Sequence, residues 1–499
     1  MRGRFHSVGE DTHLVGSVGG GHRRRRQVRV GAPDPSLTAV SGMAAVTELV
    51  DRLGMITLLD AAVGRIKQRC RGFGAGELLV GLASAQLAGE DSLVGLDRQR
   101  VDVAGQEISP VAGLSSTTAG GLARRFTDPQ WRAVEAGVAR ITERVFERLP
   151  VRRQMRLAES VTIDLDTTDV EVYGSEKRGV SYNHQGQRVG RPHVACWAEM
   201  ETVLAAELFS GNDDARASAP GMLKRALTGL PRDVRRGRVR LRADTGYFDG
   251  TLARVAFLEG IEFAIGAKRI APMWRLLSGL SEQDWTDAID MDTAQVAVAS
   301  YRPAWWPAKT EILIRRVKLD ISQVSADSRS RRRRTLHPEQ RALPLDELAD
   351  ADSIYAYSFV CTNIDVSTPA KAAAVEHWYR QRTTIENLFQ DSKHGAALRH
   401  LPSGYKEINT AWMHGALLAA DIAAWLHQLT ATESRDRDGQ TLIGHGIRGG
   451  KAMIATLHHR LIRVPGRLVS HAGQAILRLP PGHGLLAEIL ARLRKIPAT

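Results

Sequence analysis

Cysteine is scarce in this chain of 499 residues, which contains only Cys70, Cys196 and Cys361. These residues lie far apart, with no Cys-x-x-Cys pair and no His/Cys cluster at zinc-ligand spacing. The sequence therefore indicates neither a disulfide framework nor a structural zinc site. This cysteine usage predicts a reducing compartment, the cytoplasm.

Long apolar runs and nucleotide-binding loops are also missing. The longest apolar stretch, Ala411–Leu429, carries two histidines and Asp421, so we expect a buried helix rather than a membrane span. Arg23–Arg26 are not followed by an apolar segment, which argues against a secretory signal. No Gly-x-x-x-x-Gly-Lys-[Ser/Thr] loop is present, so an ATP-driven mechanism is not indicated.

Positive charge, in contrast, is plentiful. The chain has 68 Lys and Arg residues against 55 Asp and Glu residues, which gives a net charge of +13. Such an excess favours a polyanionic partner, most simply nucleic acid. A composition of 43% hydrophobic and 25% charged residues is typical of a globular protein, and the length predicts roughly two to four domains.

The first 150 residues divide into two parts. Residues 1–40 are rich in Gly, Arg and His and predict a disordered basic arm, unless translation begins at Met43. Residues 41–150 show helical periodicity and predict an all-α, DNA-binding domain. Within it, a Ser/Thr cap precedes a short helix that ends in Arg124 and Arg125. These arginines could enter a DNA groove as part of a helix-turn-helix, but a helical packing module with solvated arginines gives the same pattern.

Strand patterns take over after residue 157. The predicted strands are Val161–Ile163, His193–Met200, Val203–Phe209, Val239–Ala243 and Ile261–Gly266, and the predicted helices between them are Pro220–Leu230 and Phe248–Glu259. Three antiparallel strands followed by alternating helices and strands is the order of the ribonuclease H-like fold. We therefore expect an α/β fold divided into a core (157–269), a β-rich insertion with an exposed Ser328–Arg334 loop (270–355), a second part of the core (356–430) and a C-terminal region (431–499).

Acidic residues stand at the ends of two predicted strands. Strand alternation places Asp164 and Asp166 on one face, and Asp244 ends the fourth strand. Each alone is also an ordinary capping or turn residue. In a ribonuclease H-like sheet the first and fourth strands are neighbours, so these acids and Glu386 would converge. Converging carboxylates repel one another unless divalent cations such as Mg²⁺ or Mn²⁺ neutralise them. Two such ions would suit phosphodiester hydrolysis and strand transfer.

A polar stripe is expected around Glu386. If the segment from Tyr379 to Lys393 is one helix, with about 100° per residue, then Tyr379, Arg382, Glu386 and Lys393 share one face. One acid among cations could hold a metal ion against a phosphate backbone. A solvated face with an Arg382–Glu386 pair is the alternative.

The motifs DLDTT, RADTGYF and Y-x-x-R-x-x-x-E-x-x-x-x-x-x-K, in this order, resemble those of DDE transposases of bacterial insertion sequences. The resemblance is to the branch with the Tyr-Arg-Glu-Lys signature, the insertion sequence 1380 family. It extends over about residues 45 to 480 and includes the stretches VYGSEKRGVSYNHQGQRVGRPH and GIEFAIGAKR.

This resemblance implies roles for particular residues. Asp166, which directly precedes Thr-Thr, Asp244 and Glu386 would form the catalytic site and hold two Mg²⁺ or Mn²⁺ ions. The resemblance implies that further residues contact DNA, namely Tyr379, Arg382 and Lys393 at the terminal phosphates, with Trp305 or Trp306 as the aromatic that stacks on a displaced base. Core packing is the alternative role for either tryptophan.

The implied function is that of a transposase in the bacterial cytoplasm, associated with the nucleoid. It would bind terminal inverted repeats, cleave the element ends and join them to target DNA, as a homodimer that pairs two ends. Two alternatives remain: a nuclease of the same fold without strand transfer, and a catalytically silent, transposase-derived DNA-binding protein.

Overall fold

The computed structural model describes residues 28–69, 71–320, 324–325, 334–335, 353–435, 441–445 and 450–498. Its contacts divide the chain into Met1–Asp34 and Pro35–Thr499, and all the helices and strands below belong to the second unit. Most of the predicted basic arm, 1–40, and most of the Arg-rich Ser328–Arg334 segment lie outside the described residues.

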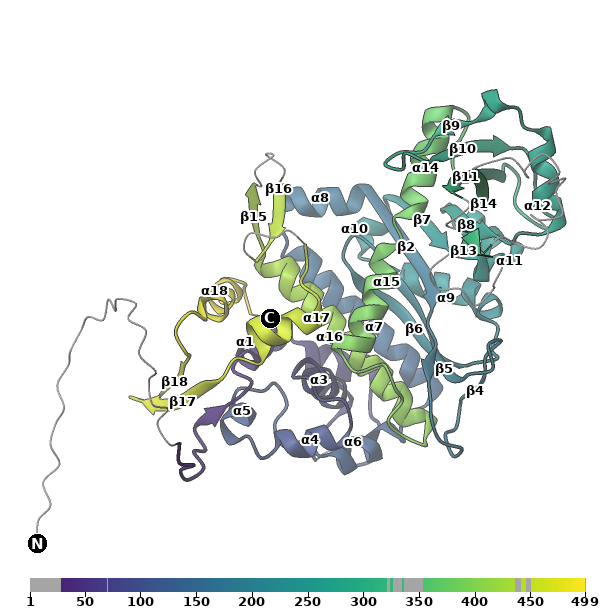
Figure 1. Cartoon of the computed structure of the whole chain (residues 1–499). Helices are drawn as coiled ribbons and strands as arrows, with labels where there is room; N and C mark the ends of the chain where they lie inside the picture. The colour runs from purple at the N-terminus through teal and green to yellow at the C-terminus, as the bar shows by residue number, and fades with distance from the viewer. Residues whose placement is uncertain are drawn as a thin grey trace, which may run out of the picture. The chain divides into compact units, whose positions relative to one another are not determined.

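Helices follow one another from Met43 to Glu159 (Figure 1). They are α1 (Met43–Leu53), α2 (Met55–Val63), α3 (Ala75–Leu87), α4 (Val94–Gln99), α5 (Val103–Glu107), α6 (Ser116–Ala123), α7 (Asp128–Glu147) and α8 (Val151–Glu159). Gly54, with φ of 59°, ends α1 and lets the chain turn into α2, a conformation that favours glycine. The buried side chains of these helices belong to the same hydrophobic core as those of the sheet.

A mixed sheet of 11 strands forms the centre of the unit. Its first strands are β2 (Ser160–Thr167), β3 (Val170–Glu171), β4 (Ser181–Tyr182), β5 (Arg188–Trp197), β6 (Thr202–Ser210), β7 (Arg238–Ala243) and β8 (Glu262–Ala267). β6, β5 and β2 are antiparallel neighbours, and β7 and β8 follow in parallel to β2. The order β6-β5-β2-β7-β8 places the first and fourth core strands side by side, which confirms that prediction.

Burial explains why β2 lies at the centre of the sheet. Residues Val161–Leu165 are buried without a break, so both faces of this strand are covered. The covering helices include α9 (Ala215–Gly229), which contacts β2, β5 and β6, and α11 (Gly250–Leu258), which contacts β8. α10 (Arg232–Arg235) precedes β7.

The same sheet continues through the predicted insertion. The strands of the insertion are β9 (Thr286–Asp287), β10 (Ala294–Ala299) and β11 (Glu311–Asp320), and β14 (Ser353–Thr362) lies mostly in the predicted second part of the core. β14 pairs with both β8 and β11, so the described strands of the insertion extend the core sheet in the order β8-β14-β11-β10-β9. The segment also contains α12 (Ala271–Arg275) and the short pair β12 (Val324–Ser325) and β13 (Arg334–Thr335). Figure 1 shows α14 (Pro369–Arg380) beside β9, β10 and β11, which it contacts.

The apolar Ala411–Leu429 stretch lies within α16 (Lys406–Thr430), which is buried on nearly all sides. α16 packs against α3 and β6, so the predicted buried helix is confirmed. Within the described ranges, no helix is long and apolar enough to cross a membrane. After α16 come β15 (Thr432–Arg435), β16 (Thr441–Gly444), α17 (Ile454–Leu457), β17 (Gly466–His471), β18 (Gln474–Arg478) and α18 (Gly484–Leu493). β17 and β18 form a small sheet with β1 (Leu37–Thr38).

Candidate active site

Two acids lie at the carboxyl ends of adjacent parallel strands. In the register of β2 and β7, Leu165 stands opposite Ala243, and the next residues along the two strands are Asp166 and Asp244. β7 ends at Ala243, and Asp244 caps the 3-10 turn Thr245–Tyr247 by accepting a hydrogen bond from Gly246 N at 2.8 Å. Parallel pairing therefore brings together two acids that are far apart in the sequence.

The third predicted acid, Glu386, lies on a different element. It lies exposed on α15 (Thr383–Gln390), which contacts β2. Burial raises the pKa of Asp166 from its ordinary value of 3.8 to about 6; Arg382 opposes this shift, and the charges of Asp244 and Glu386 add to it. The charges of both other acids thus contribute to the pKa of Asp166, and the contribution of Asp244 is larger than that of Glu386.

Asp164, two residues before Asp166, has a different role. Its side chain is fully buried, and both oxygens accept hydrogen bonds from the Arg242 guanidinium, at 2.7 and 2.8 Å. Arg242 also donates to the carbonyl of Trp378 at 2.6 Å, and the indole ring of Trp378 lies against it. A buried carboxylate paired in this bidentate way is a structural ion pair. This pairing leaves Asp166 as the accessible acid of β2.

The segment from Tyr379 to Lys393 is not a single helix, so the predicted stripe on one helix face is wrong. α14 ends at Arg380, Arg382 precedes α15, and Lys393 lies in the π-helical turn Asp391–Gly395. The break lies at Gln381 and Arg382, between the end of α14 and the start of α15. It also allows the Arg382 side chain to reach the end of β2.

Arg382 lies directly against the acids. Its Nη2 donates to Asp166 Oδ2 at 3.1 Å, and its side chain is only 13% exposed. Burial lowers the pKa of Arg382, but the charges of Asp166, Tyr379 and Asp244 outweigh this and raise it. The hydroxyl of Tyr379 donates to the carbonyl of Ala243 at 3.2 Å. A Cβ at Gly266 would lie 2.7 Å from that hydroxyl oxygen, so this position requires glycine.

Lys393 extends the site along the chain after β2. Its Nζ donates to the carbonyl of Asp169 at 2.8 Å. The Asp169 carboxylate accepts hydrogen bonds from Arg191 Nε at 2.7 Å and Asn183 Nδ2 at 2.8 Å. Burial alone would raise the pKa of Asp169, but the hydrogen bonds from Arg191 and Asn183 lower it. No role for Asp169, Arg191 or Asn183 was predicted from the sequence, although Asp169 ends the DLDTTD run that contains Asp166.

The acids suit a divalent cation in donor type, because carboxylate oxygens are the hard ligands that Mg²⁺ and Mn²⁺ prefer. Their arrangement is not that of a formed metal centre: across the described ranges, no three His, Cys, Asp or Glu side chains are grouped as ligands. The positive charge beside Asp166 is that of the Arg382 guanidinium. Behind the acids, the buried Tyr247 hydroxyl has no hydrogen-bond partner among the residues that the structure describes, and burial together with Asp166 and Asp244 raises its pKa.

The structure separates the two predicted tryptophans. Trp305 is 81% exposed and has φ of 69°, which is unusual for a residue other than glycine. Trp306 is 7% exposed and packs against Phe248 and Phe263, with ring centroids 5.3 and 5.9 Å away. The expectation that Trp306 could stack on DNA is therefore not met by this conformation, because its ring lies in the core.

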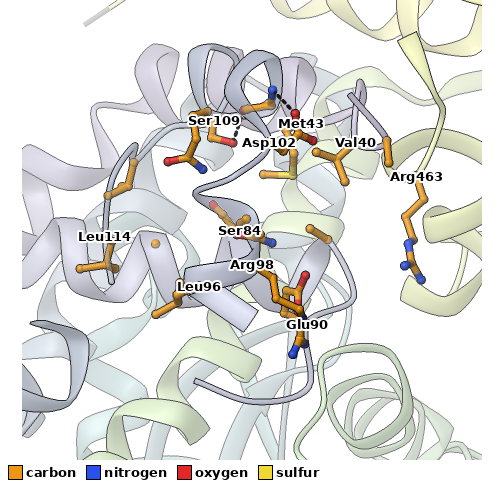
Figure 2. Close-up of a pocket in the computed structure, with 17 residues that line it drawn as sticks. Val40, Met43, Ser84, Glu90, Leu96, Arg98, Asp102, Ser109, Leu114 and Arg463 are labelled. Atoms are coloured by element: carbon orange, nitrogen blue, oxygen red, sulfur yellow. Dashed lines mark hydrogen bonds and ion pairs between the residues drawn. The ribbon is translucent and has the colours of Figure 1, made fainter. Parts of the chain in front are cut away.

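Arg124 and Arg125 follow α6, whose N-terminus Ser115 caps by accepting from Thr118 N at 3.2 Å. Both arginines are exposed. Figure 2 shows a separate pocket of about 170 Å³ among the N-terminal helices, which includes Ser84, Asp102 and Arg463 in its lining. None of the residues predicted to form the catalytic or DNA-binding site lines that pocket.

A family model described as "Transposase DDE domain group 1" matches residues 21–327, more than half of the chain. The match includes Asp166 and Asp244 and ends before Glu386. Among solved structures, the cryo-EM structure of a piggyBac transposase synaptic complex with hairpin DNA matches with a TM-score of 0.37 and 10% identity, over 83% of this chain and 79% of that chain. Similarity this low supports no conclusion. A comparison with curated proteins found no match. By the family match, the chain belongs to the transposase DDE domain group 1 family.

Proposed function

We propose that this chain is an insertion-sequence transposase that binds terminal inverted repeats, cleaves the DNA at the element ends and joins them to target DNA. The observation that carries the proposal is the placement of Asp166 and Asp244 at adjacent strand ends, where the pKa of Asp166 also responds to Glu386. The family match supports the same class of chemistry. The sequence motifs favour a bacterial element of the insertion sequence 1380 family, acting in the cytoplasm at the nucleoid.

Asp166, Asp244 and Glu386 would hold two Mg²⁺ or Mn²⁺ ions. When bound, such ions activate the attacking water or 3′-hydroxyl and stabilise the leaving oxygen of an in-line displacement. Glu386 is exposed, and Asp244 holds its backbone contact to Gly246 through one oxygen only, so both retain free carboxylate oxygens.

Arg382, Tyr379 and Lys393 would position the terminal phosphates. Arg382 now binds Asp166, and a DNA phosphate offers the guanidinium a stronger, bidentate partner. Transfer of Arg382 from the carboxylate to a phosphate frees the Asp166 oxygen at the moment DNA arrives. Lys393 donates to the backbone carbonyl of Asp169, and its ammonium could turn from there to the same DNA backbone.

Further contacts to DNA are assigned to the exposed groups. Trp305 would stack on a displaced base during hairpin formation, because its ring is open to solvent. Arg124 and Arg125 would contact the DNA backbone from the helical segment 41–150. A homodimer is expected in the synaptic complex because two element ends must be paired.

The test uses the full chain with Mg²⁺ and a labelled duplex carrying the inverted repeats that flank the gene. Cleavage and joining at the repeat ends support the proposal. Cleavage without joining indicates a nuclease, and binding without cleavage indicates a silent DNA-binding protein. Glu386→Gln should lose cleavage and keep binding. Glu259→Gln, at an exposed glutamate that follows α11, should keep both. Metal-dependent cleavage retained by Glu386→Gln would overturn the site assignment.

A further inference from the structure

Two arginines from distant parts of the chain lie on one exposed tyrosine. Tyr405 precedes α16 and is 43% exposed. The guanidinium carbon of Arg124, at the end of α6, lies 5.0 Å from the centre of its ring. That of Arg178, in the loop between β3 and β4, lies 5.6 Å from it. Both distances are within the range of a cation–π contact.

The loop that carries Arg178 is fastened to the residues before α16. Arg178 N donates to the carbonyl of Gly404 at 3.0 Å, and the Lys177 ammonium donates to the carbonyl of Leu401. The carbon stem of Lys406 covers Gly179, where φ is +71° and a Cβ would lie 2.9 Å from Lys406 Cδ. These contacts hold the arginine, the tyrosine and Lys406 in a fixed arrangement.

We name this surface the Tyr405 patch and define it by its exposed residues, which are Arg124, Arg125, Arg178, Tyr405 and Lys406. Among the residues that the structure describes, none of its four cations forms an ion pair with a carboxylate. Other exposed arginines do: Arg236 lies 3.6 Å from Asp233, and Arg494 lies 3.5 Å from Glu48. The patch therefore gathers positive charge that the protein itself does not neutralise.

We propose that the Tyr405 patch binds the sugar–phosphate backbone of double-stranded DNA. The proposal rests on the proposed function for the identity of the partner and adds a surface that joins α6 to the loop after β3. Stacking on Tyr405 orders the guanidiniums of Arg124 and Arg178 before binding, so less side-chain entropy is lost when they contact phosphates. Among the described residues, the guanidinium N–H groups of Arg124 and Arg178 form no hydrogen bond to a protein acceptor, so they remain available as donors to phosphates.

Salt dependence of DNA binding tests the patch without any need to know the repeat sequence. A 30-base-pair duplex of arbitrary sequence would be titrated with the full chain in EDTA, by fluorescence anisotropy, between 50 and 200 mM KCl. The slope of log K against log salt is negative, and each lost phosphate contact reduces its magnitude by about 0.9. Arg124→Gln/Arg178→Gln should therefore reduce the magnitude of the slope by about 1.8. It should also weaken the affinity at 0.1 M salt by a factor on the order of 50.

Matched variants separate a binding role from a structural one. Arg236→Gln/Arg494→Gln removes the same charge from cations that are already paired and should leave the slope close to that of the unmodified chain. Tyr405→Phe should bind as the unmodified chain does, whereas Tyr405→Leu should bind more weakly at an unchanged slope.

If the patch had only a structural role, Arg124→Gln/Arg178→Gln would lower the melting temperature and keep the salt slope of the unmodified chain. That result would overturn the proposal. If Arg124→Gln/Arg178→Gln folds poorly, Arg125→Gln/Lys406→Gln provides the same test of the salt slope, because these two side chains do not contact the Tyr405 ring. The unmodified chain could fail to cleave DNA while the arginine variant still shows the reduced salt slope. That result would count against the proposed chemistry alone, because binding in EDTA involves no reaction.

Discussion

Two aspartates on one strand should respond in opposite ways to loss of charge. Asp166→Asn is expected to stabilise the protein at pH 8, although the residue is assigned to catalysis. The pKa of Asp166 in the folded chain is about 6, against an ordinary value of 3.8. The folded state therefore binds the proton more tightly than the unfolded state does. Stability is highest below pH 3.8, falls as the pH rises to 6, and stays low above that value.

The size of this loss follows from the difference between the two pKa values. At 1.36 kcal/mol for each pH unit, ionisation of Asp166 costs the folded state about 3 kcal/mol above pH 6. An asparagine cannot ionise and does not incur that cost. Asp166→Asn should thus raise the free energy of unfolding by up to about 3 kcal/mol at pH 8 and change it little at pH 4.

Asp164→Asn is the matched control on the same strand. It removes the partner of Arg242, whose side chain is buried, and leaves that guanidinium without a counter-charge. Breaking a buried ion pair from one side costs about 3–5 kcal/mol, so this variant should be destabilised at pH 8. The opposite signs would distinguish an acid held for chemistry from an acid held for structure.

Urea denaturation of the three proteins at pH 4 and pH 8, in EDTA, measures these differences. Adding Mg²⁺ at pH 8 should stabilise the unmodified protein more than Asp166→Asn, because the variant loses a ligand oxygen. Equal destabilisation of Asp166→Asn and Asp164→Asn at pH 8 would contradict the assignment of different roles to the two aspartates. A stability gain that was equal at both pH values would also refute the prediction, since the cost would then not come from ionisation.

The geometry of the site predicts the effects of three further substitutions, at Asp244, Arg382 and Trp305. Asp244→Asn should abolish end cleavage in a denaturing-gel assay and keep duplex binding within a few-fold. Arg382→Ala should raise the affinity for Tb³⁺, read by luminescence, on the order of 10-fold, because it removes a cation 3.1 Å from Asp166; Arg380→Ala, whose partner is Glu376, should not. Arg382→Ala should also give fewer joined products. Trp305→Ala should reduce hairpin products at an unchanged melting temperature, since the ring is exposed.

Much of the fold could be predicted from local sequence patterns. Strand-forming segments and turn residues predicted β2, β5, β6, β7 and β8 along the chain, because these are local features. That the first and fourth of these strands are neighbours was expected from the ribonuclease H-like fold, and the pairing of β2 with β7 confirms it. The insertion could not be placed from such features. Its described strands belong to the core sheet because β14 pairs with β8 and β11, and that pairing depends on residues far apart in the sequence.

The break before α15 could not be predicted from local sequence patterns. The helical pattern from Tyr379 to Lys393 is real on either side of Arg382, but Arg382 itself turns toward Asp166. A periodicity count cannot include that attraction, which comes from another strand. Trp305 and Trp306 pose the same difficulty, since only Phe248 and Phe263 decide which of the two neighbouring rings is buried.

The amino-acid sequence by itself determined which acids could serve a phosphodiester reaction and on which strands they stand, because residue type and strand period need no distant partner. Only the tertiary structure decided which acid of β2 is accessible and which cation now covers it. Asp164 and Asp166 have the same chemistry and the same strand face. The pairing of Asp164 with Arg242 and the contact of Arg382 with Asp166 separate them, and both form only when distant segments fold together.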